Sequence, residues 1–571
     1  MSVTERDQTG ANGLSAHAKR AGARHPALAA RAARWAVPFS VVLGILLARN
    51  AWLFSAPVYE DADLGAYSIQ VEQARRFTLL VGNYSREKFN HPGPAFLYVQ
   101  AWGEDLCYAA LRVVPAAWNG QVLGLYLLTA FFAASVVVTG WRWGGPRGGL
   151  ATLGVLGLYG GLHPSVFSSA WMPYVYAPAF LALLVSVASV AAGRTGDAWL
   201  AALSGWFLIH GHACFLLFVP LLWLGAAASP LAPRVRRRAQ ERVAERAAAD
   251  TTDRPPKHPR TRLCPIPERR TWLPVAAISA VFALPLAIEL ALHWPGNFGR
   301  YFAYSDSSQP GGHTLTQVAD YVLWFWWPHA GAWAVAAALA LAAAVAAWRM
   351  RAGPVRRFCR ALLEAGALST IAFIAYAATG IDELNQFYIG YFYWAAPVLA
   401  ILVLALAATQ LASTGGPAPA SVSAAATVTA IVVIAALAGC TAFAAAPQTR
   451  LSTEHADPAD PAATGPVSDP NLPAGVAHIA RLAAGRPVVL TIAQHDAWPA
   501  VTGLLVQAER SGVRACVAGQ NWEFMMTSQF ICARGEIRDG RRFSVWMPGG
   551  VPRGMPLVFR LRRGIVTSDP K

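Results

Sequence analysis

The residues best suited to chemistry lie just after the first long apolar run, in "YEDADLGAY" and the later stretch "YSREKFNHPGPAFLY". The first stretch contains Asp61 and Asp63, and the second supplies Arg86, Lys88 and His91. A carboxylate can deprotonate an acceptor hydroxyl, while nearby cations neutralise a phosphate leaving group. The alternative is a solvated loop whose acids and bases pair loosely and contribute little.

The tripeptide Asp61-Ala62-Asp63 has a second interpretation, in which both carboxylates bind a divalent cation through hard oxygen ligands. Short acidic pairs are common in loops, so this motif establishes no cofactor and leaves a divalent cation open. The seven cysteines show no CxxC pair or other spacing typical of zinc or redox sites.

The composition places the chain among polytopic membrane proteins. Of its 571 residues, 55% are hydrophobic and only 14% are charged, which argues against a soluble globular protein. The formal charge of +16 comes from basic residues concentrated beside apolar runs, where orientation in a bilayer explains them. We therefore expect no nucleic-acid partner, since no basic groove or stacking module is visible.

A helix needs roughly 20 apolar residues to cross the hydrocarbon core. By this measure the sequence predicts a mainly α fold with about eleven spans. One run is interrupted by "IHGHA", which predicts a turn or broken helix that faces protein rather than lipid. The predicted spans are 35–55, 119–140, 148–163, 175–192, 198–210, 213–228, 272–293, 329–348, 361–379, 387–412 and 422–445.

Arginine-rich loops set the expected orientation, because Lys and Arg in short loops stay in the cytoplasm. With the N-terminus inside, the loop 56–118 that carries the acidic cluster falls outside. This alternation of inside and outside loops requires residues 92–113 not to cross the membrane but to lie along the outer face as an amphipathic, partly embedded helix. Two acids and an arginine make the segment a poor span.

The chain divides into a disordered cytoplasmic N-terminus (1–34), a transmembrane domain (35–445), a linker (446–485) and an external α/β domain (486–571). Within the transmembrane domain, residues 229–271 carry twelve basic residues against five acids and predict a disordered cytoplasmic loop.

In the external domain, strand patterns at 487–493 and 513–519 flank a helix at 498–510, which predicts a βαβ-like unit. Cys516 and Cys532 share this oxidising compartment, so we expect a disulfide between them.

Polar groups near or within the membrane are costly unless they are paired or face a water-filled cavity. His210 and His212 at the helix break are therefore candidates for a substrate pocket, with structural packing as the alternative. Glu289 is an intramembrane carboxylate and hence a candidate site, although an ion pair with a neighbouring Arg would also explain it. The aromatic run "YVLWFWWPH" at 321–329 favours an interfacial belt over sugar stacking.

The order of these features resembles the GT-C superfamily of polyprenyl-phosphate-sugar-dependent membrane glycosyltransferases. "HPGP" at 91–94 is similar to the Lys/His-Pro-Pro turn of its mannosyl- and aminoarabinosyl-transferase branches. "GNYSREKFNHPGPAFLY" is closer still to the "YSR…NHPGP" signature of uncharacterised actinobacterial polytopic proteins assigned to this superfamily. "SSAWMPYVYAPAF", "LIHGHACF" and "LPLAIELALHWPGNFGRYFAY" extend the resemblance over the first 305 residues, although Met172 replaces the usual Asn beside Trp171.

The resemblance implies an inverting transferase in a bacterial plasma membrane, with a polyprenyl-phosphate-linked sugar as donor and a cell-envelope glycan, lipid or protein as acceptor. It implies Asp63 as catalytic base, with Asp61 as second choice. The residues that it implies for substrate binding are Arg86, Lys88, Asn90, His91, Trp171, His210, His212 and Glu289.

Two other classes of function remain as alternatives. A transporter or flippase for a lipid-linked or polar substrate would predict inverted repeats and charges spread along the spans. The sequence shows no convincing repeat, and its charges favour the outer rim. A structural or assembly protein of the envelope with a degenerate pocket is the third class.

Overall fold

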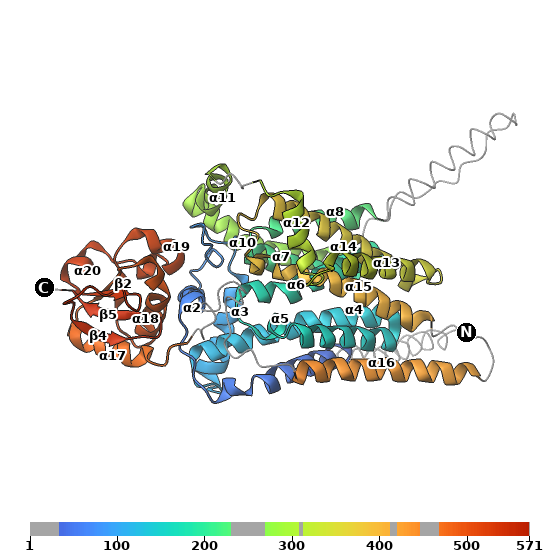
Figure 1. Cartoon of the computed structure of the whole chain (residues 1–571), viewed down its shortest axis with the longest axis horizontal. Helices are drawn as coiled ribbons and strands as arrows, with labels where there is room; N and C mark the ends of the chain where they lie inside the picture. Colours follow the sequence, from blue (N-terminus) through green and yellow to red (C-terminus); the bar gives the residue numbers. More distant parts are fainter. Residues whose placement is uncertain (1–32, 230–268, 308–311, 412–419, 446–467, 570–571) are drawn as a thin grey trace, which may run out of the picture.

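The computed structural model describes residues 33–229, 269–307, 312–411, 420–445 and 468–569. Figure 1 shows a bundle of long helices with a small C-terminal domain at one end, next to α2 (Ala62–Arg75). The described chain is mainly helical with a small C-terminal sheet, as the sequence predicts. The N-terminal prediction lies outside the described residues except for 33 and 34, and so does most of the basic loop 229–271.

Helices cover every apolar run that was predicted to span, beginning with a helix over residues 33–49. A break at His212 separates the helix that ends at Gly211 from the helix that begins at Phe215, as the "IHGHA" pattern predicts. The bundle contains η1 (Ala51–Phe54), α2, α3 (Ala95–Gly103), η2 (Glu104–Ala110), α4 (Ala117–Leu162), α5 (Ser165–Ser168), α6 (Met172–Ala191), η3 (Thr195–Asp197), α7 (Ala198–Gly211), α8 (Phe215–Ala228), α10 (Arg269–His293), α11 (Gly296–Ser307), α12 (Leu315–Trp324), α13 (Ala332–Arg349), α14 (Pro354–Thr379), η4 (Phe387–Trp394), α15 (Ala395–Leu411) and α16 (Ala420–Ala445).

Six helices in the described part of the chain are long and apolar enough to cross a membrane. Two shorter apolar helices, Phe215–Ala228 and Ala430–Ala445, accompany them. The predicted count of eleven spans stays a prediction. The six are Ala117–Leu162, Met172–Ala191, Thr271–His293, Ala332–Arg349, Pro354–Thr379 and Phe387–Gln410.

α4 is two helices joined at a sharp bend. Gly145 has φ 65° and ψ −161°, a conformation that favours glycine, and Pro146 follows it. Because proline lacks the N–H that would continue the helical ladder, the bend falls at this point. The two halves correspond to the separate apolar runs predicted at 119–140 and 148–163.

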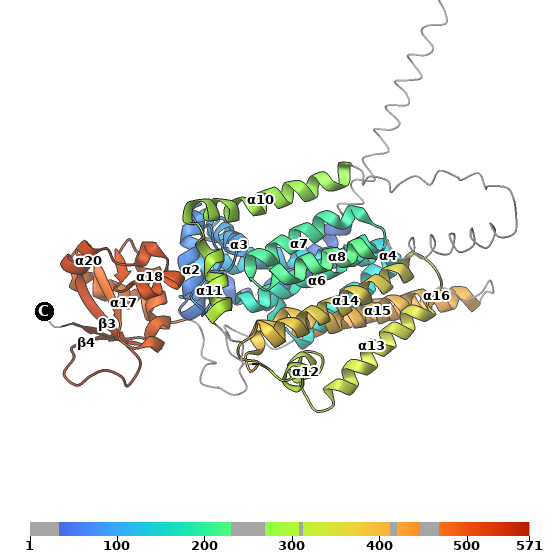
Figure 2. The ribbon, with the colours of Figure 1, turned by 90° about the horizontal axis from the view of Figure 1, so that it is seen from above.

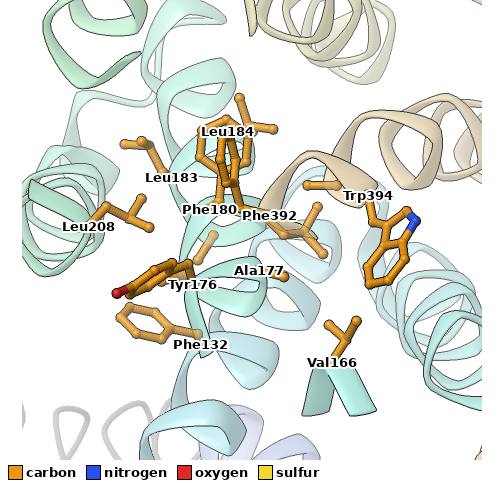
Figure 3. Packing of buried hydrophobic residues seen from close by; sticks show 14 of the residues in the cluster. Phe132, Val166, Tyr176, Ala177, Phe180, Leu183, Leu184, Leu208, Phe392 and Trp394 are labelled. Atoms are coloured by element: carbon orange, nitrogen blue, oxygen red, sulfur yellow. The ribbon is translucent and has the colours of Figure 1, made fainter. Parts of the chain in front are cut away.

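α6 lies inside the bundle and carries much of its core. Pro173 occupies the first turn, where a missing N–H costs little, and the apolar residues that follow are buried on all sides. Phe180 is fully buried, and its ring centroid lies 5.0 Å from that of Phe392 in η4 and 5.8 Å from that of Phe218 in α8. Figure 3 shows this packing, and Figure 2 shows α10 at the outer edge of the bundle beside α7.

The segment predicted as an amphipathic helix at 92–113 is formed by α3 and the π-helix η2. Trp102, Leu106 and Leu111 are exposed apolar residues, whereas Glu104 is buried. The segment therefore presents an apolar face outward and turns an acid into the protein.

The C-terminal domain is a five-stranded mixed sheet in the order β2-β1-β3-β5-β4. β1 (Val488–Ile492) pairs in parallel with β2 (Ala515–Val517) and β3 (Arg541–Trp546), and α18 (Trp498–Arg510) connects β1 to β2 as predicted. β5 (Ile565–Ser568) pairs antiparallel with β3 and with β4 (Leu557–Arg560). Cys516 on β2 is joined to Cys532 by a disulfide. The shorter helices of the domain are α17 (Leu472–Ala483), η6 (His495–Ala497), η7 (Gln520–Trp522), α19 (Glu523–Met526), η8 (Ser528–Phe530) and α20 (Arg534–Asp539).

The C-terminal domain begins earlier than the sequence indicated. Leu472, Val476 and Ile479 of α17 are buried in the same apolar core as α18 and the sheet. Residues 472–483 therefore belong to the domain, and the predicted boundary at 486 was too late. The amphipathic pattern of α17 was read as part of the Pro/Ala/Asp-rich linker, of which residues 446–467 are not described.

α18 packs against α2 so closely that the contact requires glycines. A Cβ added to Gly65 would lie 2.8 Å from Thr502 Oγ1, and one added to Gly503 would lie 3.1 Å from the carbonyl oxygen of Glu60. Thr502 also donates a hydrogen bond to the carbonyl oxygen of Ala62. The C-terminal domain is thus fitted directly onto the loop that carries the acidic cluster.

Candidate functional site

A cavity of about 710 Å³ lies where the first loop, the helix bundle and the C-terminal domain meet. The first loop contributes Asp63, Tyr84, Arg86, Lys88 and His91 to its lining. The bundle contributes aromatic and imidazole side chains, and the C-terminal domain closes the remaining wall. These other lining residues include Trp171, Tyr176, His212, Trp324, Tyr388, His495, Trp498, Asn521, Trp522 and Phe524.

Asp63 is held by two hydrogen bonds inside this cavity. Trp171 donates its indole N–H to Oδ2 over 2.9 Å, and the hydroxyl of Tyr84 donates to Oδ1. Trp171 immediately precedes α6, while Asp63 lies in the first turn of α2, so two separate elements fix the carboxylate. Hydrogen bonds from both sides hold the carboxylate in one orientation within the cavity.

Asp61 does not share the cavity with Asp63. It immediately precedes α2, is 1% exposed, and faces the C-terminal domain, where its Oδ2 lies 3.8 Å from Nε of Arg563. Asp61 has an extended backbone (φ −129°, ψ −170°), whereas Asp63 lies in the first turn of α2, so the two side chains leave the backbone in different directions. The structure therefore does not bring Asp61 and Asp63 together in the cavity, and the joint cation site and the choice of Asp61 as second candidate for the base stay predictions without support from this placement.

The surroundings of Asp61 disfavour its charged form. Burial is the largest cause and raises the pKa of this carboxyl to about 7, with Asp469 adding to the shift and Arg563 opposing it. Its Oδ1 is buried without a hydrogen-bond partner in the described structure. Among the described residues, no group of three or more His, Cys, Asp or Glu side chains is placed to hold a metal ion.

His91 and His212 form a close pair on the cavity wall, with ring centroids 4.1 Å apart. Burial lowers the pKa of His91 well below its ordinary value, with a further contribution from His212, and burial lowers the pKa of His212 to about 4. Both rings are therefore neutral at pH 7.

Backbone hydrogen bonds fix the tautomers of this pair. The backbone N–H of Ala213 donates to Nδ1 of His91 over 3.3 Å, and that of Cys214 donates to Nδ1 of His212 over 3.2 Å. A neutral imidazole whose Nδ1 accepts a hydrogen bond carries its proton on Nε2. The pair thus supplies two neutral N–H donors to the site.

Arg86 and Lys88 both line the cavity but differ in their surroundings. The guanidinium of Arg86 pairs with Asp382, and it lies 3.2 Å from Glu87 and 3.7 Å from Glu383. The ammonium of Lys88 forms no ion pair or hydrogen bond with the described part of the chain. Lys88 is therefore the cation better placed to meet an incoming anion, although the sequence named both residues for substrate binding.

Three predicted substrate residues do not line the cavity. Asn90 donates its side-chain amide to the carbonyl oxygen of Phe524 over 2.9 Å, which ties the first loop to the C-terminal domain. Glu289 accepts the backbone N–H of Asn297 over 3.0 Å and so closes the turn between α10 and α11. Both side chains are buried and already used in holding the structure.

His210 is the third of these residues. Its Nε2 lies 2.8 Å from the carbonyl oxygen of Phe282, and its ring lies directly against Gly93 of the "HPGP" turn. A Cβ at position 93 would lie 2.4 Å from Nδ1 of His210, so only glycine fits this contact. His210 therefore shapes the turn that presents His91 instead of facing the cavity itself.

A buried ionic cluster, which the sequence did not reveal, joins the first loop to the C-terminal domain. Its members, here named the glutamate cluster, are Glu60, Glu72 and Glu104 with Arg75 and Arg510. Nη1 of Arg510 lies 2.8 Å from Oε1 of Glu60, and its other nitrogens lie 3.5 Å from Glu72 and 3.6 Å from Glu104. Burial opposes the charge on Arg510, yet the combined attraction of the three glutamates raises the pKa of its guanidinium.

Comparison with models of known protein families and with curated proteins finds no match to this chain.

Proposed function

We propose that this chain is a bacterial plasma-membrane glycosyltransferase that moves a sugar from a polyprenyl-phosphate donor to an extracytoplasmic acceptor of the cell envelope. In this reaction Asp63 takes the proton of an acceptor hydroxyl as the oxygen attacks the anomeric carbon. The bond from that carbon to the phosphate oxygen breaks as the new bond forms, and polyprenyl phosphate leaves. The anomeric configuration is inverted because a single displacement occurs.

The observation that carries the proposal is the position of Asp63. This carboxylate is fixed by Trp171 and Tyr84 inside a cavity of about 710 Å³, large enough for a sugar and part of an acceptor. A general base must be held within hydrogen-bond reach of the proton that it removes. Two donors from separate elements provide this restraint.

In this proposal, the negative charge of the leaving phosphate is stabilised by a cation and N–H donors that line the cavity. Lys88 offers a point charge without a competing acid, and His91 and His212 offer two neutral N–H donors. Donors aimed at a developing anion stabilise it most strongly where water is excluded. In this proposal Arg86 has a secondary role, because Asp382 and Glu383 already hold its guanidinium.

A lipid-linked donor explains why the site is combined with several long apolar helices. The proposed membrane lies around these helices, with the cavity and the C-terminal domain at the extracytoplasmic end. The disulfide between Cys516 and Cys532 supports this orientation, because disulfides persist in oxidising compartments.

A transporter would require a substrate site near the middle of the bundle. The cavity instead borders the C-terminal domain, and Glu289, an intramembrane candidate for transport, is engaged by the backbone of Asn297. These observations favour transfer over transport.

The test is to profile lipid-linked sugars in a strain that lacks the gene. A transferase predicts accumulation of one polyprenyl-phosphate sugar on the outer leaflet and loss of the corresponding sugar from an envelope component. A transporter predicts accumulation on the cytoplasmic side, and an assembly protein predicts an unchanged donor pool. Either of the latter two results would overturn the proposal, and the accumulating lipid would identify the donor.

A further inference from the structure

The C-terminal domain contributes an aromatic surface to the cavity. His495 of η6 and Trp522 of η7 stack with their ring centroids 5.3 Å apart and their planes 30° apart. His495 is exposed and Trp522 is half-buried, while Asn521 beside them is exposed. The pair therefore offers ring surface with an amide next to it, within the same cavity as Asp63.

Two other aromatic residues on this wall have a packing role. The rings of Trp498 and Phe524 contact the ring of Tyr84 edge-on, with centroids 6.4 Å and 6.1 Å from it. Tyr84 also donates its hydroxyl to Asp63. Trp498 and Phe524 thus hold the group that positions the carboxylate, whereas His495 and Trp522 make no such contact with Tyr84 or Asp63 in the described structure.

In a direct displacement, the acceptor and the leaving phosphate occupy opposite sides of the cavity. The acceptor oxygen must attack from the side opposite the leaving phosphate, and a lipid-linked phosphate must remain on the side of the apolar helices. Asp63 lies between Trp171 at the start of α6 and Tyr84, which borders the C-terminal domain. The proposed reaction assigns the acceptor to the other wall of the cavity, formed by the C-terminal domain, which carries His495 and Trp522.

We infer that this wall is the acceptor subsite and that the acceptor is a carbohydrate, whose ring stacks on Trp522 and His495 while Asn521 bonds its hydroxyls. The inference rests on the proposed function, which sets the direction of sugar transfer. It names the class of acceptor that the proposed function leaves open. Flat aromatic rings match the C–H face of a sugar, and an adjacent amide supplies both a donor and an acceptor.

The experiment measures binding of two neutral oligosaccharides, a mannopyranose trisaccharide and an arabinofuranose trisaccharide, to the purified full-length protein by titration calorimetry without donor. We expect at least one to bind, and Trp522→Ala and His495→Ala each to weaken that binding about tenfold. Trp102→Ala, an exposed tryptophan on α3 outside the cavity, is the matched control and should bind as the wild type does. Because His495 is exposed, its variant serves as the test if Trp522→Ala fails to fold.

The outcomes separate this inference from the proposed function. Binding that Trp522→Ala and His495→Ala leave unchanged would overturn the inference, as would binding of neither oligosaccharide. Transfer to a lipid or a protein that both variants leave intact would also overturn it. Binding of an oligosaccharide that both variants weaken, without any transfer by the wild type, would refute the proposed function and leave the carbohydrate site standing.

Discussion

Arg510 of the C-terminal domain forms a buried ion pair with Glu60 of the first loop, with 2.8 Å between Nη1 and Oε1. The two residues are 450 positions apart in the chain. Glu72 and Glu104 lie on other sides of the same guanidinium. Arg510 therefore adds a buried ionic contact to the packing and hydrogen bonds that join the C-terminal domain to the segment that carries Asp63.

Replacing Arg510 with Met should weaken the attachment of the domain to the first loop. The change leaves Glu72 and Glu104 with Arg75 and removes the ion pair of Glu60, and breaking a buried ion pair typically costs about 3–5 kcal/mol. We expect a markedly lower melting temperature in detergent. The control is Arg514→Met, which breaks a largely exposed pair with Glu536 and should cost at most about 1 kcal/mol. Equal melting temperatures for the two variants would contradict the structural role of Arg510.

Asp61 should make stability depend on pH. Because burial raises its pKa from 3.8 to about 7, the folded protein binds a proton that the unfolded chain releases. The stability that this proton supplies is lost as pH rises from about 4 through 7. Asp61→Asn removes this dependence, so its melting temperature relative to the wild type should be higher at pH 8 than at pH 5. The same difference at both values would show that Asp61 does not titrate in this range.

The proposed orientation can be tested by cysteine labelling in intact cells. Arg553→Cys is exposed in the C-terminal domain, and Thr195→Cys is exposed in η3, between α6 and α7. An impermeant thiol reagent should label position 553 directly, and position 195 only after the cells are made permeable. The reverse pattern would place the cavity on the cytoplasmic side and would exclude an external acceptor.

Lys88 and Arg86 should differ in their effect on the donor. Lys88→Gln removes a cation that forms no ion pair with the described part of the chain. The KM for the polyprenyl-phosphate sugar should therefore rise about tenfold or more, as expected when a charged hydrogen bond is lost. Arg86→Gln removes a cation already paired with Asp382, so its KM should change less. A larger effect from Arg86 would mean that it leaves its acids to bind the phosphate.

Part of the site could be predicted from the sequence because its members are close along the chain. Asp63, Arg86, Lys88 and His91 come from one loop, in which the resemblance also identified the "HPGP" turn. All four line the cavity. The sequence did not reveal the separation of Asp61 from Asp63, because residues 62–75 fall within the predicted loop 56–118 and show no clear helical pattern. Both faces of α2 are largely buried, so its apolar and polar residues do not segregate in the way that reveals a surface helix.

The remainder of the site depends on contacts between distant segments. Arg510 ends an amphipathic helix, where a basic residue is ordinary, and nothing nearby in the sequence indicates that three glutamates surround it. Trp522 and His495 follow short strands in a domain whose docking on the first loop the sequence does not specify. A signal for that docking existed in Gly503 within a helix, because glycine there is costly without a close contact.

The central claim is that Asp63 is the base of a transfer reaction. The most direct measurement uses membranes from the deletion strain that carry wild type, Asp63→Asn or Asp61→Asn, together with the donor lipid that profiling identifies. Initial rates of sugar transfer are compared at matched protein levels. We predict that Asp63→Asn lowers the rate by roughly 10²-fold or more with little change in the KM for the donor, while Asp61→Asn retains most of the rate. Transfer at the wild-type rate by Asp63→Asn would contradict the account.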